Sequence, residues 1–136
     1  MKMIPMSALA LGLVLTTAAS AEAKLPLRDV PKIDNNMLWV ALAIEISDKC
    51  DQIKPRTLKG LLFLNSLKNT ARAMGYSDAE IKEYVKSDEE KARMRDRGEA
   101  YVKSKGLNPA DTGDLCTLGH AEIAQNSQVG VLLKAK

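Results

Sequence analysis

The chain has 136 residues, of which 46% are hydrophobic, 27% are charged and only 4% are aromatic. Its formal net charge of +3 is close to neutral for this length. A nucleic-acid-binding protein would need a strongly basic surface to neutralise phosphates, so the charge argues against that class. The length suits one domain and hardly two.

Residues 1–21 have the pattern of a cleavable signal peptide. Lys2 gives a positive start, an apolar run is strongest over 8–15, and small residues gather over 16–23. The small-x-small pattern places the predicted cut after residue 21, with a second choice after residue 23. A retained membrane anchor is the alternative, but the apolar run is shorter than the roughly 20 residues of a spanning helix. We therefore expect a periplasmic or secreted protein with no stable membrane insertion after cleavage.

The chain has two cysteines, Cys50 and Cys116. In an oxidising compartment, two cysteines in a small domain most simply form one disulfide. A bond closing so long a loop would stabilise the fold by roughly 4 kcal/mol on the chain-entropy model. Free thiols and metal ligands are the alternatives.

Residues 22–33 contain two prolines and show no helical period. This favours an extended arm that either lies on the body or hangs free. The single helical domain is then expected over 34–136.

The first predicted helix begins near Asp34 or Asn35, either of which can cap it. Apolar residues follow at spacings of three and four, which places them on one helical face: Trp39, Ala43, Ile46, Cys50 and Ile53. Neighbouring apolar residues widen this face, so we expect the helix at the centre of a small bundle with Cys50 pointing inward.

The second predicted helix spans about 57–74, and Gly75 is placed to end it. Its leucine-rich stripe is typical of a core-facing surface and consists of Leu61, Leu64, Leu67, Ala71 and Met74.

Two capping patterns, at residues 77–80 and 87–90, predict a short third helix and then a fourth that ends near Gly106. One kinked helix is the alternative. The many charges here indicate a solvated face with ion pairs, such as Glu89 with Arg93 and Glu99 with Lys103. A single anion pocket formed by Arg93, Arg95 and Arg97 is disfavoured, because alternate residues on a helix point in different directions.

A turn-rich loop over 107–114 precedes a fifth predicted helix, capped by Asp111 or Thr112 and containing Cys116 and His120. A last helical turn is expected near Val131–Leu133, and no strand of useful length is indicated. The sequence therefore predicts an all-α fold, a small bundle of about four to five helices tied by one disulfide.

Cys116 and His120 stand four residues apart and could face the same way. A free Cys116 could then be a nucleophile with His120 as its base. A zinc site would need three or four ligands, and beyond the cysteines only His120 and Asp114 are candidates. No phosphate-binding loop or catalytic triad pattern is found. We expect no catalytic residue, no metal site, no cofactor and no enzymatic activity.

Several segments resemble a domain-of-unknown-function family of short exported proteins, mostly from alphaproteobacteria. They are Gly75–Ser77, Ala79–Ile81, Glu90–Arg93 and Leu115–Ala124, followed by Gly130 and Leu132-Leu133. The resemblance covers most of the chain after residue 21, including both cysteines, and implies an exported two-cysteine helical domain without an established activity. In that family a basic residue, often arginine, commonly stands at the position of His120. The resemblance therefore argues against a family-wide metal or catalytic role for His120.

Three functions fit these expectations. We favour a non-enzymatic binding or accessory module for an unknown periplasmic or envelope protein, without nucleic acid as a partner. An acid-stress periplasmic chaperone is the first alternative, since acid would remove the carboxylate charges. An inhibitor or immunity protein against an envelope enzyme is the second, with Tyr76, Tyr84 and Tyr101 as candidate anchors.

Overall fold

The computed structural model describes residues 24–136, so the predicted signal peptide lies outside the described residues. The described chain forms five α-helices: α1 (Pro31–Lys49), α2 (Thr57–Ala73), α3 (Asp78–Lys86), α4 (Asp88–Ser104) and α5 (Thr112–Ala124). Two 3-10 turns and two short strands complete it: η1 (Leu27–Asp29), η2 (Gly130–Leu132), β1 (Ile53–Pro55) and β2 (Leu133–Ala135). The predicted fold class, a small all-α bundle tied by one disulfide, is confirmed.

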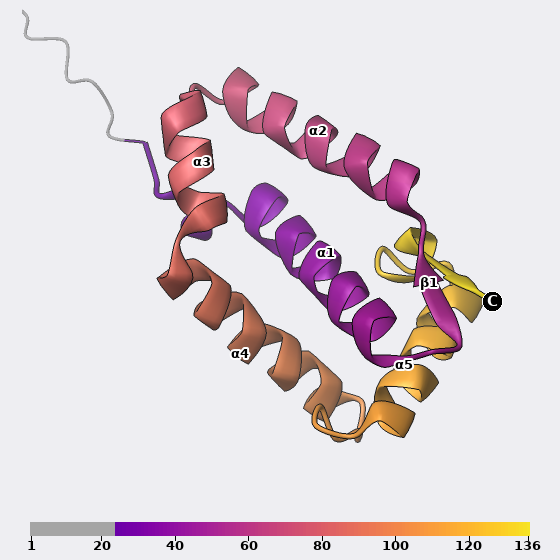
Figure 1. The fold of residues 1–136 in the computed structure, drawn as a ribbon. Coiled ribbons are helices and arrows are strands. Elements are labelled where there is room, and N and C mark those ends of the chain that lie inside the picture. Colours follow the sequence, from indigo (N-terminus) through magenta and orange to yellow (C-terminus); the bar gives the residue numbers. More distant parts are fainter. Residues whose placement is uncertain (1–23) are drawn as a thin grey trace, which may run out of the picture.

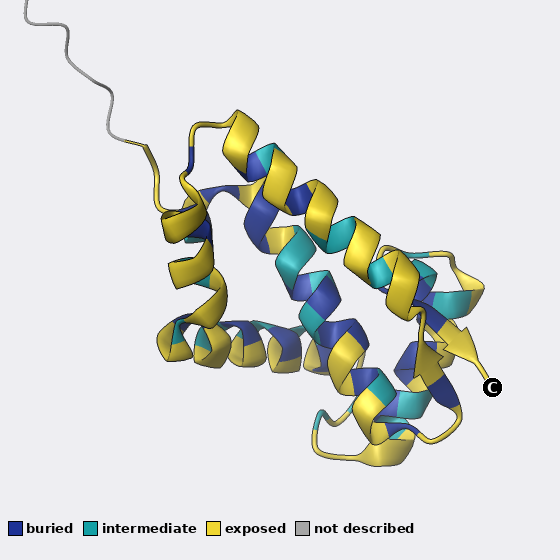
Figure 2. Ribbon diagram, turned by 45° about the horizontal axis from the view of Figure 1, so that its top comes forward, coloured by how far each residue is buried: buried dark blue, intermediate teal, exposed yellow. Residues whose placement is uncertain are grey.

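Helix α1 lies at the centre of the bundle (Figure 1). α2 runs along one side of it and α4 along the other, α3 joins these two at one end, and α5 closes the opposite end with the strands. Buried residues are concentrated on α1 and on the faces of its neighbours turned toward it (Figure 2). The near-continuous apolar sequence of α1 explains this position, because only a central helix can bury apolar residues on several sides. No helix in residues 24–136 combines the length and apolar content needed to cross a membrane.

The segment before α1 packs on the body. Leu27, Val30 and Ile33 are buried against residues of α2 and α3, so the alternative of an arm that hangs free is wrong for residues 24–33. α1 begins at Pro31, three residues before the expected cap, with Val30 as its N-cap. Proline fits the first helical turn because it lacks the N–H that would be unpaired there. The sequence prediction missed this start because it treated proline as a helix breaker.

Helix α2 has the expected length and ends before Gly75, whose φ of +93° suits glycine. Leu67 and Ala71 are its only buried residues. The prediction that its whole leucine stripe is core is wrong, because Leu61 and Met74 are exposed. The helix lies at the edge of the bundle, and no other element within residues 24–136 covers its outer face (Figure 2).

Helices α3 and α4 are separate, as their two capping patterns predict. The Ser77 hydroxyl accepts from the N–H of Glu80, and the Glu80 carboxylate accepts in return from the N–H of Ser77. Ser87 caps α4 through the N–H of Glu90. Gly106, with a φ of +74°, follows the end of α4. The kinked single helix is therefore excluded.

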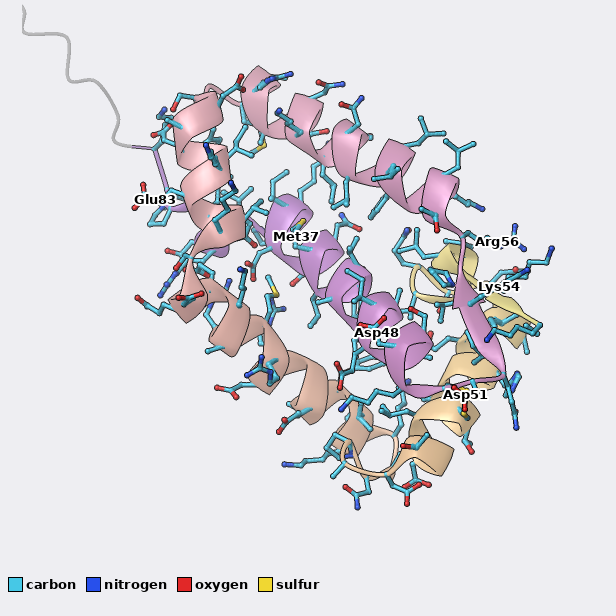
Figure 3. All side chains as sticks on the ribbon, viewed as in Figure 1. Met37, Asp48, Asp51, Lys54, Arg56 and Glu83 are labelled. Atoms are coloured by element: carbon cyan, nitrogen blue, oxygen red, sulfur yellow. A yellow bond between two sulfur atoms is a disulfide. The ribbon has the colours of Figure 1, made fainter. Side chains whose placement is uncertain are left out.

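The two strands were not expected from the sequence. β1 and β2 pair antiparallel, with Ile53 opposite Ala135 and Lys54 opposite Lys134. Each strand has three residues, too few for a recognisable alternation, and their pairing joins segments far apart in the chain. Lys54 and Arg56 project from the edge of the molecule where β1 leads into α2 (Figure 3).

Helix α5 is held close to α1 and β1 at a small residue. Asp111 caps it by accepting from the N–H of Asp114. An added Cβ at Gly119 would lie 2.4 Å from a side-chain carbon of Ile53 and 2.7 Å from one of Ile46. Residues 115–125, with the sequence LCTLGHAEIAQ, therefore supply a contact surface for the core.

Candidate functional site

The cysteine and histidine of α5 do not form a reactive pair. Cys116 is joined to Cys50 with an S–S distance of 2.05 Å, so no free thiol is present. His120 is exposed, and its Nε2 lies 3.0 Å from Oε1 of Gln52. The disulfide and this contact both join α5 to the chain that follows α1.

Asp114 is also used locally, since its carboxylate accepts from the N–H of Asn108 at 2.8 Å. In residues 24–136 no group of three or more histidine, cysteine, aspartate or glutamate side chains is arranged to hold a metal ion.

A buried charge network surrounds Asp34, which is only 4% exposed. Arg93 donates to both carboxylate oxygens, at 2.5 and 3.0 Å, and Arg97 also donates to this carboxylate. The hydroxyl of Tyr84 donates to it at 2.5 Å. The network therefore joins the first turn of α1 to both α3 and α4.

The network continues through Glu90. Arg93 also donates to the carboxylate of Glu90 at 2.8 Å, and Arg28 donates to its other oxygen. Arg28 also binds Glu89 at 2.8 Å. The segment before α1 is thus joined to the start of α4 by charge, while its apolar residues pack on α2 and α3.

The expected pair of Glu89 with Arg93 does not form, because Glu89 binds Arg28 and Arg93 turns toward Asp34. Three successive alternate arginines cannot share one pocket, as expected, but Arg93 and Arg97 stand one turn apart and share the anion Asp34. The sequence pattern predicts Asp34 as a helix cap, whereas in the structure it lies within the first turn of α1. The four-residue spacing of the arginines was the signal that could have indicated a buried carboxylate opposite them.

The surroundings shift the pKa values of this network. Burial alone would raise the pKa of Asp34, but hydrogen bonds from Arg93 and Tyr84 and the charges of Arg93 and Arg97 lower it below its usual value. Burial raises the pKa of Tyr84, and the hydrogen bond to Asp34 raises it further. The bond to Asp34 likewise raises the pKa of Arg93. Asp34 is therefore a structural carboxylate that stays ionised in the folded protein.

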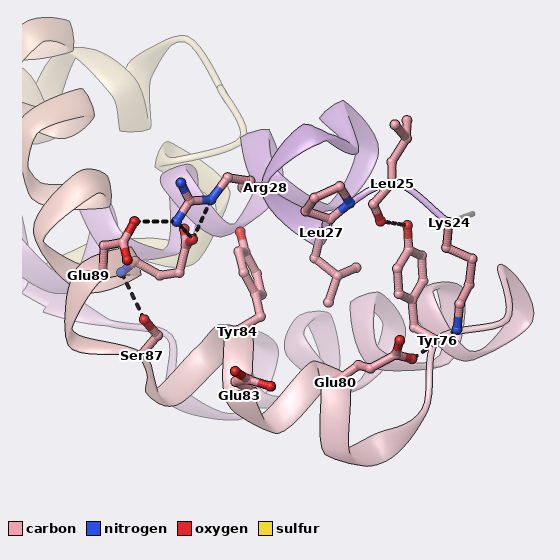
Figure 4. A pocket seen from close by; sticks show the side chains of 12 residues that line it. Lys24, Leu25, Leu27, Arg28, Tyr76, Glu80, Glu83, Tyr84, Ser87 and Glu89 are labelled. Atoms are coloured by element: carbon pink, nitrogen blue, oxygen red, sulfur yellow. Dashed lines mark hydrogen bonds and ion pairs between the residues drawn. The ribbon is translucent and has the colours of Figure 1, made fainter.

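A small pocket of about 370 Å³ lies beside this network (Figure 4). Its walls come from residues 24–28, α3 and the start of α4, and they carry charges of both signs. Lys24 binds the carbonyl of Gly75 and the carboxylate of Glu80, and Tyr76 donates to the carbonyl of Leu25 at 2.5 Å. These groups satisfy one another, so the pocket offers little unpaired chemistry to a ligand.

The three tyrosines that were candidate anchors of an enzyme inhibitor all form hydrogen bonds within the chain. Tyr76 is buried and bonded to Leu25, Tyr84 is bonded to Asp34, and Tyr101 donates to buried Glu122 at 2.5 Å. None of the three projects free hydroxyl groups to solvent as an inhibitor anchor would need.

A groove of about 970 Å³ lies between α1, α4 and the loop after α4. Apolar residues line much of its floor: Ala41, Leu42, Met94, Val102 and Leu115. Charged residues form its rim: Glu45, Lys49, Lys91, Arg95, Glu99 and Lys103. We call this hollow the α1–α4 groove. Sequence reasoning missed it because the residues of its floor look like ordinary core positions.

A second, smaller hollow extends the groove toward α3. It shares Ala41, Ile44 and Met94 with the groove and adds Val85 of α3. Ile44 and Val85 are 53% and 46% exposed, which is high for large aliphatic side chains. The apolar strip between α1 and α4 is therefore continuous and open to solvent.

Fold and site together define a disulfide-tied helical domain with a charged network inside it and an open apolar groove on one face. A family model, that of the family of unknown function DUF5333, matches residues 25–134. The chain belongs to this family. No curated protein and no solved structure compared with the chain gives a significant match.

Proposed function

We propose that the protein is an exported, periplasmic accessory module without enzymatic activity, which binds the amphipathic helix of an envelope protein in the α1–α4 groove. The observation that carries this proposal is the groove itself, whose apolar floor is flanked by charged side chains. A helix laid in such a groove buries its apolar side chains and pairs its polar flanks with the rim. The disulfide is consistent with an oxidising compartment.

The rim favours a partner helix with acidic flanks. It holds four cations and two acids, and one of those acids, Glu45, already lies 3.4 Å from Lys49. Lys91, Arg95 and Lys103 form no ion pair within residues 24–136 and are therefore free to meet carboxylates.

A photo-crosslinking amino acid at position 44 tests this function, because Ile44 is exposed on the groove wall. The matched control carries the same amino acid at Lys82, an exposed position on α3 outside the groove. We expect one envelope protein to be captured from position 44 and not from position 82, and Arg95→Glu to weaken its capture. The proposal fails if position 44 captures nothing, or if both positions capture the same proteins.

Export is tested on the same preparation. Cell fractionation should place the protein outside the cytoplasm, and its mass should correspond to a chain starting at Glu22, or at Lys24 for the second cut. A cytoplasmic protein with residues 1–21 still attached would contradict the proposed location.

A further inference from the structure

A second surface, on the opposite side of α2 from the core, combines exposed leucines with lysines. Leu58, Leu61 and Leu62 are 72%, 59% and 63% exposed. Residues three and four apart share one helical face, so the three side chains form one ridge. Leu67, the buried residue of this helix nearest to them, stands about two and a half turns after Leu58 and therefore on the other side.

The sequence on both sides of this ridge contains basic residues and no acidic ones. From Gln52 to Ser77 there are five lysines and arginines and no acidic residue. After Gln125 the chain contains two further lysines and again no acid. The nearest acid along the chain is Asp51, in the turn before β1.

The strands bring two of these cations together. Lys54 and Lys134 stand directly opposite each other in the β1–β2 pair, and both are exposed. Like charges at such positions repel. Neither lysine, nor Arg56 or Lys59, forms an ion pair within residues 24–136. An anionic partner would relieve this repulsion.

The exposed basic side chains at β1 lie next to the leucine ridge of α2. Ile53 of β1 is buried, so Lys54, the next residue of the strand, points away from the core. β1 leads into α2 within two residues, and Lys54 and Arg56 lie at the edge where it does so (Figure 3). We call this the basic leucine surface, comprising Leu58, Leu61, Leu62, Lys54, Arg56, Lys59 and Lys134.

We propose that the basic leucine surface binds the surface of an anionic lipid bilayer. Leucines that project from a convex helix can enter the boundary between headgroups and acyl chains, while lysines beside them attract anionic headgroups. A second copy of the chain is a poor occupant, because a symmetric contact would place these unpaired cations opposite themselves. The ridge projects outward, and its leucines line none of the three hollows described above, which suits a deformable lipid surface better than a rigid protein.

Vesicle sedimentation tests this proposal. The protein is recovered from expressing cells, with the same first residue, determined by mass spectrometry, in every variant. The vesicles contain phosphatidylcholine alone or phosphatidylcholine mixed with phosphatidylglycerol. We expect binding to the mixed vesicles only, and weaker binding at high salt because salt screens the lysines.

Two sets of substitutions at exposed positions locate the binding. Lys54→Gln with Lys134→Gln should weaken it by about fivefold for each lysine, and roughly 25-fold together. The triple variant L58Q, L61Q and L62Q should weaken it by about tenfold for each leucine that enters the bilayer. The matched controls are Lys32→Gln with Lys82→Gln and Ile44→Gln with Val85→Gln, which should bind as the wild type does.

Equal binding to both kinds of vesicle, no binding to either, or loss of binding in the control variants would overturn the proposal. So would an oligomer in sedimentation equilibrium that the leucine variant dissociates, because the ridge would then join two copies. Capture of an acidic protein that depends on the leucines, without vesicle binding, would assign the surface to a protein partner. Ile44 and Val85 belong to the groove and not to the ridge. A failure of the protein to bind vesicles therefore does not contradict the proposed function of the groove.

Discussion

At the level of single residues, Asp34 is the most consequential side chain of the fold. It is a buried carboxylate that accepts from two arginines and one tyrosine, and these partners come from α3 and α4. A buried ion pair is tolerated while both partners are present. Removing one partner destabilises the fold, because the other charge is left unpaired in the interior. Asp34 therefore joins three helices through one carboxylate.

Replacing Asp34 with asparagine should lower the free energy of unfolding by about 3 kcal/mol, the lower end of the range for breaking a buried pair. The lower end applies because Arg93 and Arg97 keep 26% and 32% of their side-chain surface exposed. Urea denaturation measures the loss. The matched control is Asp78→Asn, which breaks an ion pair of Arg72 with a 64%-exposed carboxylate and should cost far less, because solvent screens an exposed pair. Equal losses for the two variants would show that the Asp34 network is no more than a surface pair.

Two glycines should respond in opposite ways to alanine. A Cβ at Gly130 would lie 1.9 Å from the backbone oxygen of Glu122, which cannot move freely, so Gly130→Ala should destabilise the protein by about 3 kcal/mol. Gly60 lies within α2, and apart from its chain neighbours and the backbone of its own helix no atom of residues 24–136 lies within 4 Å of an added Cβ. There alanine should stabilise the protein by up to about 1 kcal/mol, because it favours the helix. Thermal unfolding of both variants would show the contrast, and a gain of stability in Gly130→Ala would contradict the packing described here.

At the level of elements, local signals and long-range contacts differ in what the sequence reveals. The limits of α3 and α4 could be predicted because Ser77 and Ser87 cap the starts of the two helices and Gly106 follows the end of α4. The exposure of the α2 leucines could not, because a hydrophobic pattern shows that faces are apolar but not whether a neighbour covers them. The β1–β2 pair and the contact of Asp34 with Arg93 likewise depend on partners far along the chain.

For the candidate sites, the cysteine pair could be predicted from residue type and expected compartment, and it is present. The α1–α4 groove could not be predicted. Its floor residues, such as Met94 and Val102, have the spacing of core residues, and the hollow arises from how α1, α4 and the loop after α4 are placed around it. Groove geometry of this kind is a property of helix packing and has no sequence pattern of its own.

The disulfide joins the end of α1 to the first half of α5, and both cysteines pack on the main core. Its loss in Cys50→Ala with Cys116→Ala should lower stability by roughly 4 kcal/mol, because it closes a loop with a sequence separation of 66. Denaturation of the oxidised, reduced and doubly substituted proteins measures this. Thiol titration should find no free cysteine before reduction. If reduction leaves the unfolding midpoint unchanged, the bond contributes nothing to the stability of this bundle.

For the whole molecule, the charge network predicts how stability depends on acid. Hydrogen bonds and charges of its partners hold the pKa of Asp34 in the folded protein below its usual value despite burial. In the unfolded chain the pKa of an aspartate is about 3.9. The stabilisation from Asp34 is therefore fully present above about pH 4 and is lost as pH falls through the lower folded pKa. Unfolding free energy measured against pH should decline in this window. The decline should be shallower in Asp34→Asn, and an identical decline in both proteins would assign the acid sensitivity to other carboxylates.

Alkaline conditions should act through the half-buried Tyr101, with the opposite sign. Burial, together with the hydrogen bond to Glu122, raises the pKa of Tyr101 to about 12, against about 10 in the unfolded chain. A group with a raised folded pKa stabilises the fold below its unfolded pKa, so this contribution is lost as pH rises from about 10 toward 12. Tyr101→Phe should cost about 1–3 kcal/mol at neutral pH, because it leaves buried Glu122 without its donor. The same variant should lose less further stability than the wild type above pH 10. Lysine titration affects both proteins alike. Equal losses of stability above pH 10 in the two proteins would therefore show that the pKa of Tyr101 is no higher in the folded protein than in the unfolded chain.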